Sequence, residues 1–296
     1  MSEAEARSLL SGHDLDVGPL THSSGFVNEV WLSRDHVIRL SSGRFTGVFG
    51  YEFGVLDGLP DLVPHPRAIA HGHRTGTGEY LVIERLPGSS LERVWPELSV
   101  SARRGIAAQV ADALRSMHAL PHQGWMDNPW LTDAYTVGRW SDAYHADPRY
   151  LPPMVKAARQ VRRDVADLWD RVEAWAQPRV AAFGDEPSCF AHADLRPANV
   201  MVDRDTVTGL IDFEGSRWGT AEDELVSYQQ GAAENAGPEL VDWLRKDYPE
   251  LFQRPGQPDR LQIRWLLWWL VQVHNFPAGH HQDPVPRILE LVRDRH

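Results

Sequence analysis

The sequence predicts an α+β protein with two lobes, a small N-terminal lobe built on an antiparallel sheet and a larger, mainly helical C-terminal lobe. Three short apolar runs near the N-terminus predict strands, at residues 17–21, 29–33 and 36–40. Strands in series with short connections are typical of an antiparallel sheet. Residues 99–120 repeat apolar side chains at helical spacing, with Ser99 or Ser101 as the cap. We expect the lobes to span residues 1–86 and 87–296.

Further elements follow from the same patterns. Residues 79–85 predict another strand, and the His-Gly-His at residues 71–73 predicts a turn. Helices are predicted after this point, at residues 154–177, 238–246, 260–274 and 286–294. Three tryptophans at helical spacing in the third of these helices are expected in the core, namely Trp265, Trp268 and Trp269.

Composition narrows the class of protein. The chain has 296 residues, with 42% hydrophobic and 24% charged residues, which is typical of a globular protein. A formal net charge of −11 argues against nonspecific nucleic-acid binding; it serves solubility, or it attracts a cationic small molecule. Cys189 is the single cysteine, so an intramolecular disulfide and a cysteine-based zinc site are excluded. We expect a cytoplasmic protein without a signal peptide, not bound to a membrane, and either a monomer or a homodimer.

The most informative stretch is residues 192–215, which reads HADLRPANVMVDRDTVTGLIDFEG. Asp194 is followed five residues later by Asn199 and eighteen residues later by Asp212. An apolar triplet, a polar turn and a second apolar run lie between Asn199 and Asp212, which predicts a β-hairpin. Because a hairpin returns the chain to its starting point, we expect Asn199 and Asp212 to meet at one end.

These residue types suit phosphoryl transfer, which depends on positioning an oxygen nucleophile and on Mg²⁺ to neutralise the phosphate oxygens. Mg²⁺ takes oxygen ligands, which Asp212 and Asn199 would supply. Asp194, on the preceding loop, can accept the proton of an attacking hydroxyl or orient that hydroxyl. The alternative interpretation is a polar loop before an ordinary hairpin. The second acid after a hydrophobic strand, and His192 ahead of Asp194, favour the phosphoryl-transfer site.

The segments HADLRPANVMV and GLIDFEGS resemble the aminoglycoside phosphotransferase family, within the protein-kinase-like superfamily. The family pattern H-x-D-x-x-x-x-N lies on His192, Asp194 and Asn199, and I-D-[FW]-[ED] lies on residues 211–214. The resemblance implies a bilobal protein-kinase-like fold, Asp194 as the catalytic aspartate, and Asn199 and Asp212 as Mg²⁺ ligands. It covers nearly the whole chain in the order of elements, but only this stretch is highly specific.

The third predicted strand carries Arg39 where a kinase-like fold expects the lysine of V-x-I-K. Glu52 follows thirteen residues later, in a segment with helical periodicity. This cation and acid would together hold the α- and β-phosphates, although a planar guanidinium differs from a lysine ammonium. The alternative is two separate surface charges. The loop with Ser24 and Gly25 would cover the phosphates with backbone N–H groups; its single glycine equally fits an ordinary hairpin turn.

The resemblance also implies contacts with ATP, with GTP as the alternative nucleotide. The backbone from Glu84 to Leu86 would form hydrogen bonds with the adenine edge. Apolar faces around the base would come from Val30, Val37, Met201 and Ile211. Core strands contain the same residue types, so this set depends on the resemblance alone. Glu214, at the site end of the hairpin, is expected to contact the acceptor or the metal.

Three hypotheses for function remain open. The first is an ATP- and Mg²⁺-dependent kinase that phosphorylates a hydroxyl of a cationic antibiotic, either an aminoglycoside or a basic peptide of the viomycin–capreomycin type, and so confers resistance. The second is a metabolic kinase for a sugar, an amino alcohol or a nucleoside-like compound. The third is a nucleotide-binding pseudokinase scaffold, suggested by Arg39 and the glycine-poor loop. The intact set of Asp194, Asn199 and Asp212 argues against the third.

Two segments offer candidate contacts with an acceptor. Residues 122–153 are rich in aromatic and acidic side chains, which suits either a substrate lid or a subdomain held together by its own aromatics. Residues 222–224 are three consecutive acids. The preferred interpretation is an acidic helix N-terminus, which the helix dipole stabilises, and an acceptor role comes second.

Overall fold

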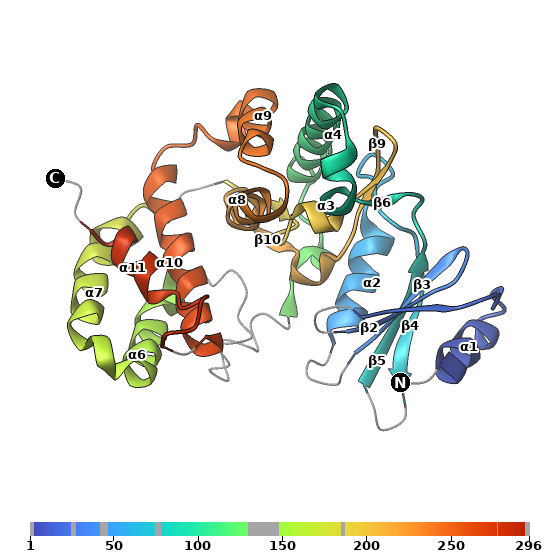
Figure 1. Ribbon diagram of the computed structural model, residues 1–296, viewed down its shortest axis with the longest axis horizontal. Helices are drawn as coiled ribbons and strands as arrows, with labels where there is room; N and C mark the ends of the chain where they lie inside the picture. Colours follow the sequence, from blue (N-terminus) through green and yellow to red (C-terminus); the bar gives the residue numbers. More distant parts are fainter. Residues whose placement is uncertain are drawn as a thin grey trace.

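The computed structural model describes residues 3–24, 28–41, 47–74, 78–129, 148–184, 187–276 and 278–293. A five-stranded antiparallel sheet forms the N-terminal part, and helices with two small sheets form the remainder (Figure 1). This arrangement confirms the predicted α+β class. No helix in the described ranges is both long enough and apolar enough to cross a lipid bilayer.

The five strands lie in the sheet order β1 (Thr21–Ser24), β2 (Glu29–Leu32), β3 (His36–Leu40), β5 (Gly78–Glu84) and β4 (Ala68–Arg74). Side chains of a strand alternate between its two faces, and both faces of β5 are apolar. Val82 belongs to a cluster with Ala6 and Leu10 of α1 (Glu3–Gly12). Leu81 and Ile83 join the main core with α2 (Val48–Gly58). The sheet is therefore covered by one helix on each face.

Two local predictions in this part are wrong. Residues 17–20 are not a strand: Gly18 has a positive φ of 33° and Pro19 has no N–H to donate, and β1 begins only at Thr21. Residues 71–73 are not a turn but lie within β4. Gly72 sits opposite Tyr80, whose ring would lie 2.8 Å from an added Cβ. The glycine therefore makes room for an aromatic ring rather than marking a turn.

The chain enters the C-terminal part through β6 (Ser89–Ser90), α3 (Leu91–Val94) and α4 (Val100–His118). Ser99 caps α4, since its side chain accepts a hydrogen bond from the N–H of Ala102 at 3.1 Å. Strand β6 pairs with β8 (Val200–Asp203), which pairs with β9 (Thr206–Leu210). A second small sheet joins β7 (Ser188–Ala191) to β10 (Arg217–Thr220).

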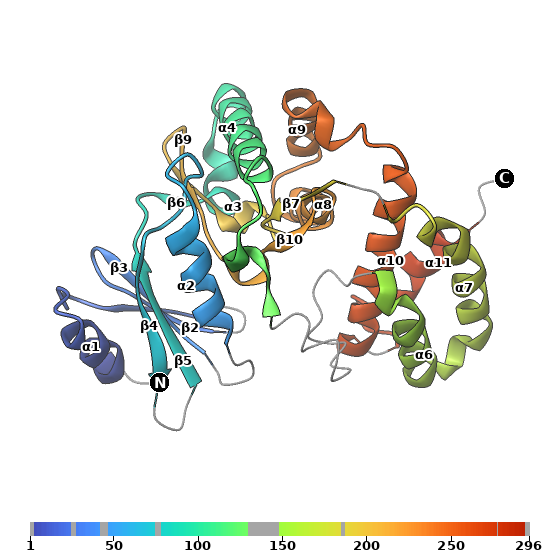
Figure 2. The same ribbon diagram turned by 180° about the vertical axis from the view of Figure 1, so that it is seen from behind.

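Six further helices complete the described C-terminal part. They are α6 (Leu151–Val161), α7 (Ala166–Val180), α8 (Asp223–Asn235), α9 (Glu239–Asp247), α10 (Gln257–Asn275) and α11 (Val285–Leu291). The last three agree with the predicted helices. Figures 1 and 2 show α6, α7, α10 and α11 grouped at the end of the molecule farthest from the five-stranded sheet.

The single helix predicted over residues 154–177 is wrong, because the chain breaks between α6 and α7. Arg162 leaves helical geometry at φ −114° and ψ 66°, and its guanidinium binds Asp164 and Asp283. The indole N–H of Trp169 then donates to the carbonyl of Arg162 at 3.1 Å. These contacts fix a corner, and they allow both helices to pack against α10.

The prediction that three tryptophans of α10 are core residues holds only in part, since Trp269 packs against the main core without being fully buried. Trp265, Trp268 and Trp269 are all only half-buried. Trp265 stacks on Trp269 with ring centroids 5.7 Å apart, and its indole N–H donates to Gln229 at 3.2 Å. The buried positions of α10 belong instead to aliphatic residues such as Leu266, Leu267 and Leu270.

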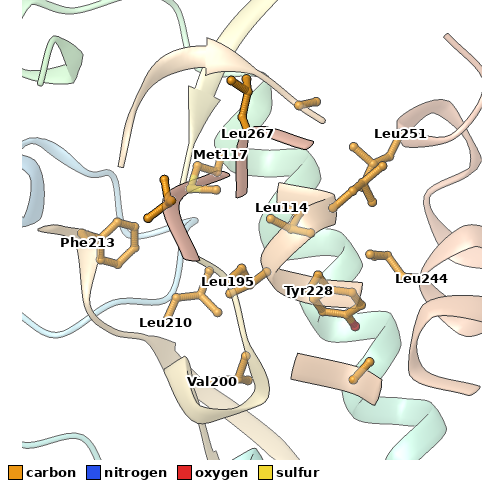
Figure 3. Close-up of a cluster of buried hydrophobic side chains, with 14 of the residues drawn as sticks. Leu114, Met117, Leu195, Val200, Leu210, Phe213, Tyr228, Leu244, Leu251 and Leu267 are labelled. Atoms are coloured by element: carbon orange, nitrogen blue, oxygen red, sulfur yellow. The ribbon is translucent and has the colours of Figure 1, made fainter. Parts of the chain in front are cut away.

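One apolar core runs through the C-terminal part beneath the hairpin of β8 and β9. Figure 3 shows Leu114 and Met117 of α4 in the same cluster of buried side chains as Leu195, Val200 and Leu210. Phe213, directly after the hairpin, is fully buried in the same core. The loop and hairpin that carry the polar motif residues are therefore fixed from below by apolar side chains.

Candidate active site

The hairpin of β8 and β9 brings two motif residues together. Val200 pairs with Leu210, and the N–H of Ile211 donates to the carbonyl of Asn199 at 3.0 Å. Asp212 therefore follows directly beside Asn199. Asp212 adopts left-handed backbone geometry, with φ 71° and ψ 56°, which costs a non-glycine residue about 1 kcal/mol or more. The bend turns the chain into the short 3₁₀ helix Phe213–Gly215.

The loop that carries Asp194 is held by Glu224 of α8. The Glu224 carboxylate, which is fully buried, accepts hydrogen bonds from the N–H groups of His192 at 2.5 Å and Ala193 at 3.1 Å. Ala193 has a φ of 64°, so this loop also contains a strained residue. The Nε2 of His192 lies 2.9 Å from the carbonyl of Ile211. Because a carbonyl only accepts, Nε2 is the donor, and the imidazole ties the loop to the hairpin.

Asp194 lies on this loop, next to the start of the hairpin. The Nδ2 of Asn199 donates to the backbone carbonyl of Asp194 at 2.8 Å, and the Nε of Arg196 lies 3.3 Å from the Asp194 carboxylate. A Cβ added to Gly215 would lie 3.9 Å from the Cβ of Asp194. Burial, together with the charge of Asp212, raises the pKa of Asp194 to about 6 against the opposing effect of Arg196.

Arg39 connects the two parts of the molecule across this site. Its Nη1 donates to both oxygens of Glu52, at 2.6 and 2.5 Å. Its Nη2 donates to Asp212 Oδ1 and to Glu214 Oε2, each at 2.8 Å. Burial alone would lower the pKa of Arg39, but the charges of Glu52, Asp212 and Glu214 outweigh it and raise the pKa. The guanidinium also lies over the ring of Phe49, 5.1 Å from its centroid.

Acidic groups outnumber basic groups in this cluster. Three carboxylates face one guanidinium, and oxygens of Glu52, Asp212 and Glu214 lie within 4.8 Å of one another. Burial raises the pKa of Glu214 to about 8, with the charge of Asp212 adding to the shift and Arg39 opposing it. Burial likewise raises the pKa of Glu52 to about 7, against the effect of Arg39. A further cation would stabilise the ionised form of these acids.

The donor set fits Mg²⁺. It consists of carboxylate and amide oxygens, which hard divalent cations prefer. Because Asn199 donates through its Nδ2 to Asp194, its Oδ1 lies on the other side of the amide and can act as an acceptor or a ligand. The side chains of Asp212 and Glu214 are 30% and 27% exposed, so both are accessible from solvent. The side chain of Glu52 is only 1% exposed.

Several of the other predicted nucleotide residues lie on the five-stranded sheet or on the β8–β9 hairpin. Val30 lies opposite Arg39 in the sheet, and Val37 lies opposite Ile83. Met201 pairs with Gly209, and a Cβ at Gly209 would lie only 2.5 Å from the Leu86 side chain. The N–H groups of Glu84 and Arg85 donate to Arg67 and Asp35. For Ser24 the structure gives only the backbone of β1, and Gly25 lies outside the described residues.

Several residues of the site were missed by the sequence motif. Arg196 forms an ion pair with Asp194. A positive charge only two positions after Asp194 was the signal in the sequence that could have indicated this pair. Asn28 donates to Glu214 at 3.4 Å, and nothing in its surroundings along the sequence indicated this. Tyr51 of α2 donates to the carbonyl of Ser216 at 2.7 Å, which joins the two parts just after the hairpin.

The three acids at residues 222–224 serve the chain itself. Glu222 pairs with Arg260, Asp223 pairs with Arg217 and Arg264, and Glu224 holds the Asp194 loop. All three side chains are at most 2% exposed. They are therefore structural rather than acceptor contacts, in line with the preferred interpretation. Of the other candidate acceptor segment, residues 130–147 lie outside the described residues.

Comparisons with known proteins agree with this geometry. A model of the phosphotransferase enzyme family matches residues 23–265. An aminoglycoside 3'-phosphotransferase of Streptomyces ribosidificus is 28% identical over 214 residues, covering 67% of this chain and 71% of the relative. A protein of the same name from Streptomyces fradiae is 29% identical over 161 residues, covering 51% of this chain and 52% of the relative.

Solved structures share the fold at low sequence identity. The gentamicin complex of APH(2'')-IIa has a TM-score of 0.69 at 14% identity, covering 99% of this chain and 96% of that one. The streptomycin–ATP complex of the same enzyme has a TM-score of 0.67 at 14% identity, covering 98% and 96%. These similarities confirm the protein-kinase-like fold expected from the sequence. The chain belongs to the phosphotransferase enzyme family, and it is a phosphotransferase of the aminoglycoside phosphotransferase type.

Proposed function

We propose that this enzyme transfers the γ-phosphoryl group of ATP to a hydroxyl of a cationic antibiotic of the aminoglycoside class, and thereby confers resistance. The observation that carries the proposal is the grouping of Asp194, Asn199 and Asp212 at one end of the β8–β9 hairpin, facing Arg39. Phosphoryl transfer requires mainly positioning and electrostatic stabilisation, and this group offers both.

The acceptor class is supported by two kinds of observation. The related Streptomyces proteins are aminoglycoside 3'-phosphotransferases, and similar structures contain gentamicin or streptomycin. A net charge of −11 would attract a polycation over a distance comparable to the Debye length. A basic peptide antibiotic of the viomycin–capreomycin type satisfies the same electrostatic argument, so it belongs in the test.

In the proposed mechanism Asp194 accepts a hydrogen bond from the acceptor hydroxyl, orients its oxygen and takes its proton as the new bond forms. Arg196 and Asn199 hold Asp194 in place for this task. Asn199 and Asp212 would hold Mg²⁺, which neutralises charge on the phosphate oxygens when bound. The buried His192 and Glu224 keep the loop fixed, so that little reorganisation is needed during the reaction.

The nucleotide would lie between an N-terminal lobe of residues 1–86 and a C-terminal lobe of residues 87–296. Arg39, held by Glu52, would contact its phosphates. The backbone near Ser24 and Gly25 would cover them. Within the hinge, the N–H groups of Glu84 and Arg85 already donate to the carbonyls of Arg67 and Asp35, so the base would meet the N–H of Leu86 and the carbonyl of Glu84. Apolar contacts with the base would come from Val30, Val37, Met201 and Ile211.

The test is ADP release by the purified protein with Mg²⁺-ATP or Mg²⁺-GTP, over a panel of aminoglycosides, basic peptide antibiotics, sugars and amino alcohols. Asp194→Ala is measured in parallel, with Asp203→Ala as the matched control, because Asp203 is an exposed acid on the same hairpin. We expect aminoglycoside-dependent turnover that falls by about 10³-fold or more in Asp194→Ala and is unchanged in Asp203→Ala.

Expression in a sensitive bacterium provides the second readout, and the active protein should raise the inhibitory concentration of the antibiotic that is turned over. Turnover confined to a sugar or an amino alcohol would replace the antibiotic proposal by a metabolic kinase. ATP binding without turnover on any acceptor, and without resistance, would contradict the proposed reaction and favour a nucleotide-binding scaffold.

A further inference from the structure

The guanidinium of Arg39 is divided between two sets of acids that differ in origin and exposure. Nη1 binds Glu52, which comes from α2 in the same N-terminal part and is 1% exposed. Nη2 binds Asp212 and Glu214, which come from the other part and are about one-quarter to one-third exposed. One nitrogen therefore makes a sealed contact, and the other makes contacts that solvent and ligands can reach.

The second set includes the carboxylate that would bind the metal. Arg39 already occupies Oδ1 of Asp212 at 2.8 Å, so a divalent cation on the same carboxylate would lie close to the guanidinium. Two cations on one partly buried carboxylate repel each other, because the protein screens their charges less than water does. Arg39 and the metal thus oppose each other as long as Nη2 stays where it is.

Arginine is suited to release one partner and keep the other. Its terminal nitrogens are separate donors on a rigid plane, whereas a lysine ammonium is a single point of charge. Nη1 can remain on Glu52 while Nη2 moves to another anion. The nucleotide phosphates are such an anion, and the proposed function brings them to Arg39 together with the metal.

We propose that Arg39 is an exchangeable counter-ion of the metal site: Nη2 holds Asp212 and Glu214 in the nucleotide-free enzyme and passes to the phosphates when metal and nucleotide bind. This inference rests on the proposed function, since it takes Asp212 as a metal ligand. It has a thermodynamic consequence. Metal alone binds weakly because Arg39 opposes it, and nucleotide strengthens metal binding because the phosphates remove that opposition.

The experiment measures Mn²⁺ binding to the full chain by electron paramagnetic resonance, with and without a non-hydrolysable ATP analogue. In Arg39→Met we expect Mn²⁺ alone to bind at least tenfold more tightly than in the wild type. The strengthening of Mn²⁺ binding by nucleotide should shrink by a similar factor. Arg159→Met is the matched control, because Arg159 of α6 also binds two acids, Asp170 and Glu173 of α7, far from the site. This variant should bind Mn²⁺ as the wild type does.

Arg39→Met leaves Glu52 buried without its partner, which can prevent this variant from folding. A second pair of variants, in which Glu52 is also replaced, avoids this problem. Glu52→Gln and the double variant Arg39→Met/Glu52→Gln differ only at residue 39. The double variant should again bind Mn²⁺ alone at least tenfold more tightly than Glu52→Gln. Circular dichroism verifies that each variant is folded.

Unchanged or weaker Mn²⁺ binding in the folded residue-39 variants would overturn the inference. Asp212→Asn separates this failure from failure of the proposed function. If Asp212→Asn loses Mn²⁺ binding while the residue-39 variants behave as their references, the metal assignment stands and the exchange by Arg39 is wrong. If Asp212→Asn binds Mn²⁺ as the wild type does, the metal assignment and the inference both fail.

Discussion

At the scale of single residues, the site depends on polar side chains whose partners are far away in the sequence. Glu224 holds the loop of Asp194 across about thirty residues, and Arg39 reaches Asp212 across 173. These contacts are buried or half-buried, where hydrogen bonds to charged groups contribute about 1.5–3 kcal/mol each and leave little freedom of position. Substitutions at these residues are therefore expected to change function through geometry or charge.

Asp212→Asn tests the role of this carboxylate in nucleotide binding. The amide is similar in shape but has no negative charge, so we expect the gain in ATP affinity caused by Mg²⁺ to fall by about tenfold or more. Titration calorimetry with and without Mg²⁺ measures that gain. ATP binding in EDTA should stay within about threefold of the wild type, and a full Mg²⁺-dependent gain in the variant would contradict the ligand assignment.

Glu224→Gln tests whether this residue positions the loop of Asp194, the proposed catalytic residue. A glutamine amide offers one acceptor oxygen where the carboxylate offers two, so one of the N–H groups of His192 and Ala193 loses its partner. A displacement of about 1 Å near the chemistry costs about 10²-fold in rate, so kcat should fall by roughly 10–100-fold.

The KM for ATP separates positioning from a general loss of structure. It should change by less than about threefold in Glu224→Gln, since the proposed nucleotide contacts do not involve Glu224. Glu234→Gln, at an exposed position near the end of the same helix α8, is the control and should leave kcat unchanged. A proportional change of KM and kcat in Glu224→Gln would argue against positioning.

At the scale of elements, the short strand β6 depends on a close backbone approach. Gly88, just before β6, has a φ of 91°, and an added Cβ would collide with the backbone carbonyl of Val202 in β8. The sheet that carries Asn199 and Asp212 therefore requires glycine at this position. This requirement comes from contact between strands more than a hundred residues apart.

Gly88→Ala is expected to destabilise the protein by about 2 kcal/mol or more, from backbone strain and the displaced strand. Thermal unfolding followed by circular dichroism measures the change as a lower midpoint. Gly105→Ala is the matched control, because Gly105 lies within α4 and an added Cβ there meets nothing within 4 Å. That substitution should stabilise the helix by about 0.5–1 kcal/mol. Equal midpoints for the two variants would refute the steric argument.

At the scale of the whole molecule, several hydrogen bonds join the sheet-based part to the region after the β8–β9 hairpin, among them one from the N–H of Phe213 to Glu52 Oε1 at 3.2 Å. Arg39 reaches Asp212 and Glu214, Asn28 reaches Glu214, and Tyr51 reaches Ser216. The contacts of Arg39 and Asn28 are with partly exposed acids at the proposed nucleotide site, whereas the Tyr51 hydrogen bond is buried. The Tyr51 hydrogen bond can therefore persist while the ion pairs of Arg39 exchange.

Tyr51→Phe removes this bridge while leaving the ring in place. Removal of one buried hydrogen bond should cost about 1 kcal/mol, partly compensated because Asn128 also donates to the Ser216 carbonyl at 2.9 Å. Hydrogen–deuterium exchange should become faster at residues 213–217. Tyr80→Phe is the control, since the Tyr80 hydroxyl contacts His13 near the surface, and it should leave exchange at these residues unchanged. Unaltered exchange in Tyr51→Phe would argue against the bridge.

Local patterns in the sequence were sufficient for a large part of this protein. Periodicity predicted α4 with Ser99 among its two candidate caps, and alternation predicted β2, β3 and β5. The motif predicted a hairpin that joins Asn199 and Asp212, because strand, turn and strand are consecutive in the chain. The assigned roles of these residues in catalysis and metal binding stay predictions.

What only the tertiary structure decided involves partners distant in the chain. Helix periodicity continues through Arg162, but the contacts with Asp283 and Trp169 break the helix there. The acids at residues 222–224 have the charge of an acceptor site, yet their partners Arg260, Arg264 and the Asp194 loop make them structural. The division of Arg39 between Glu52 and two acids of the other part likewise follows from folding. Ion pairs form through space, so the local sequence shows each charged residue but not its partner.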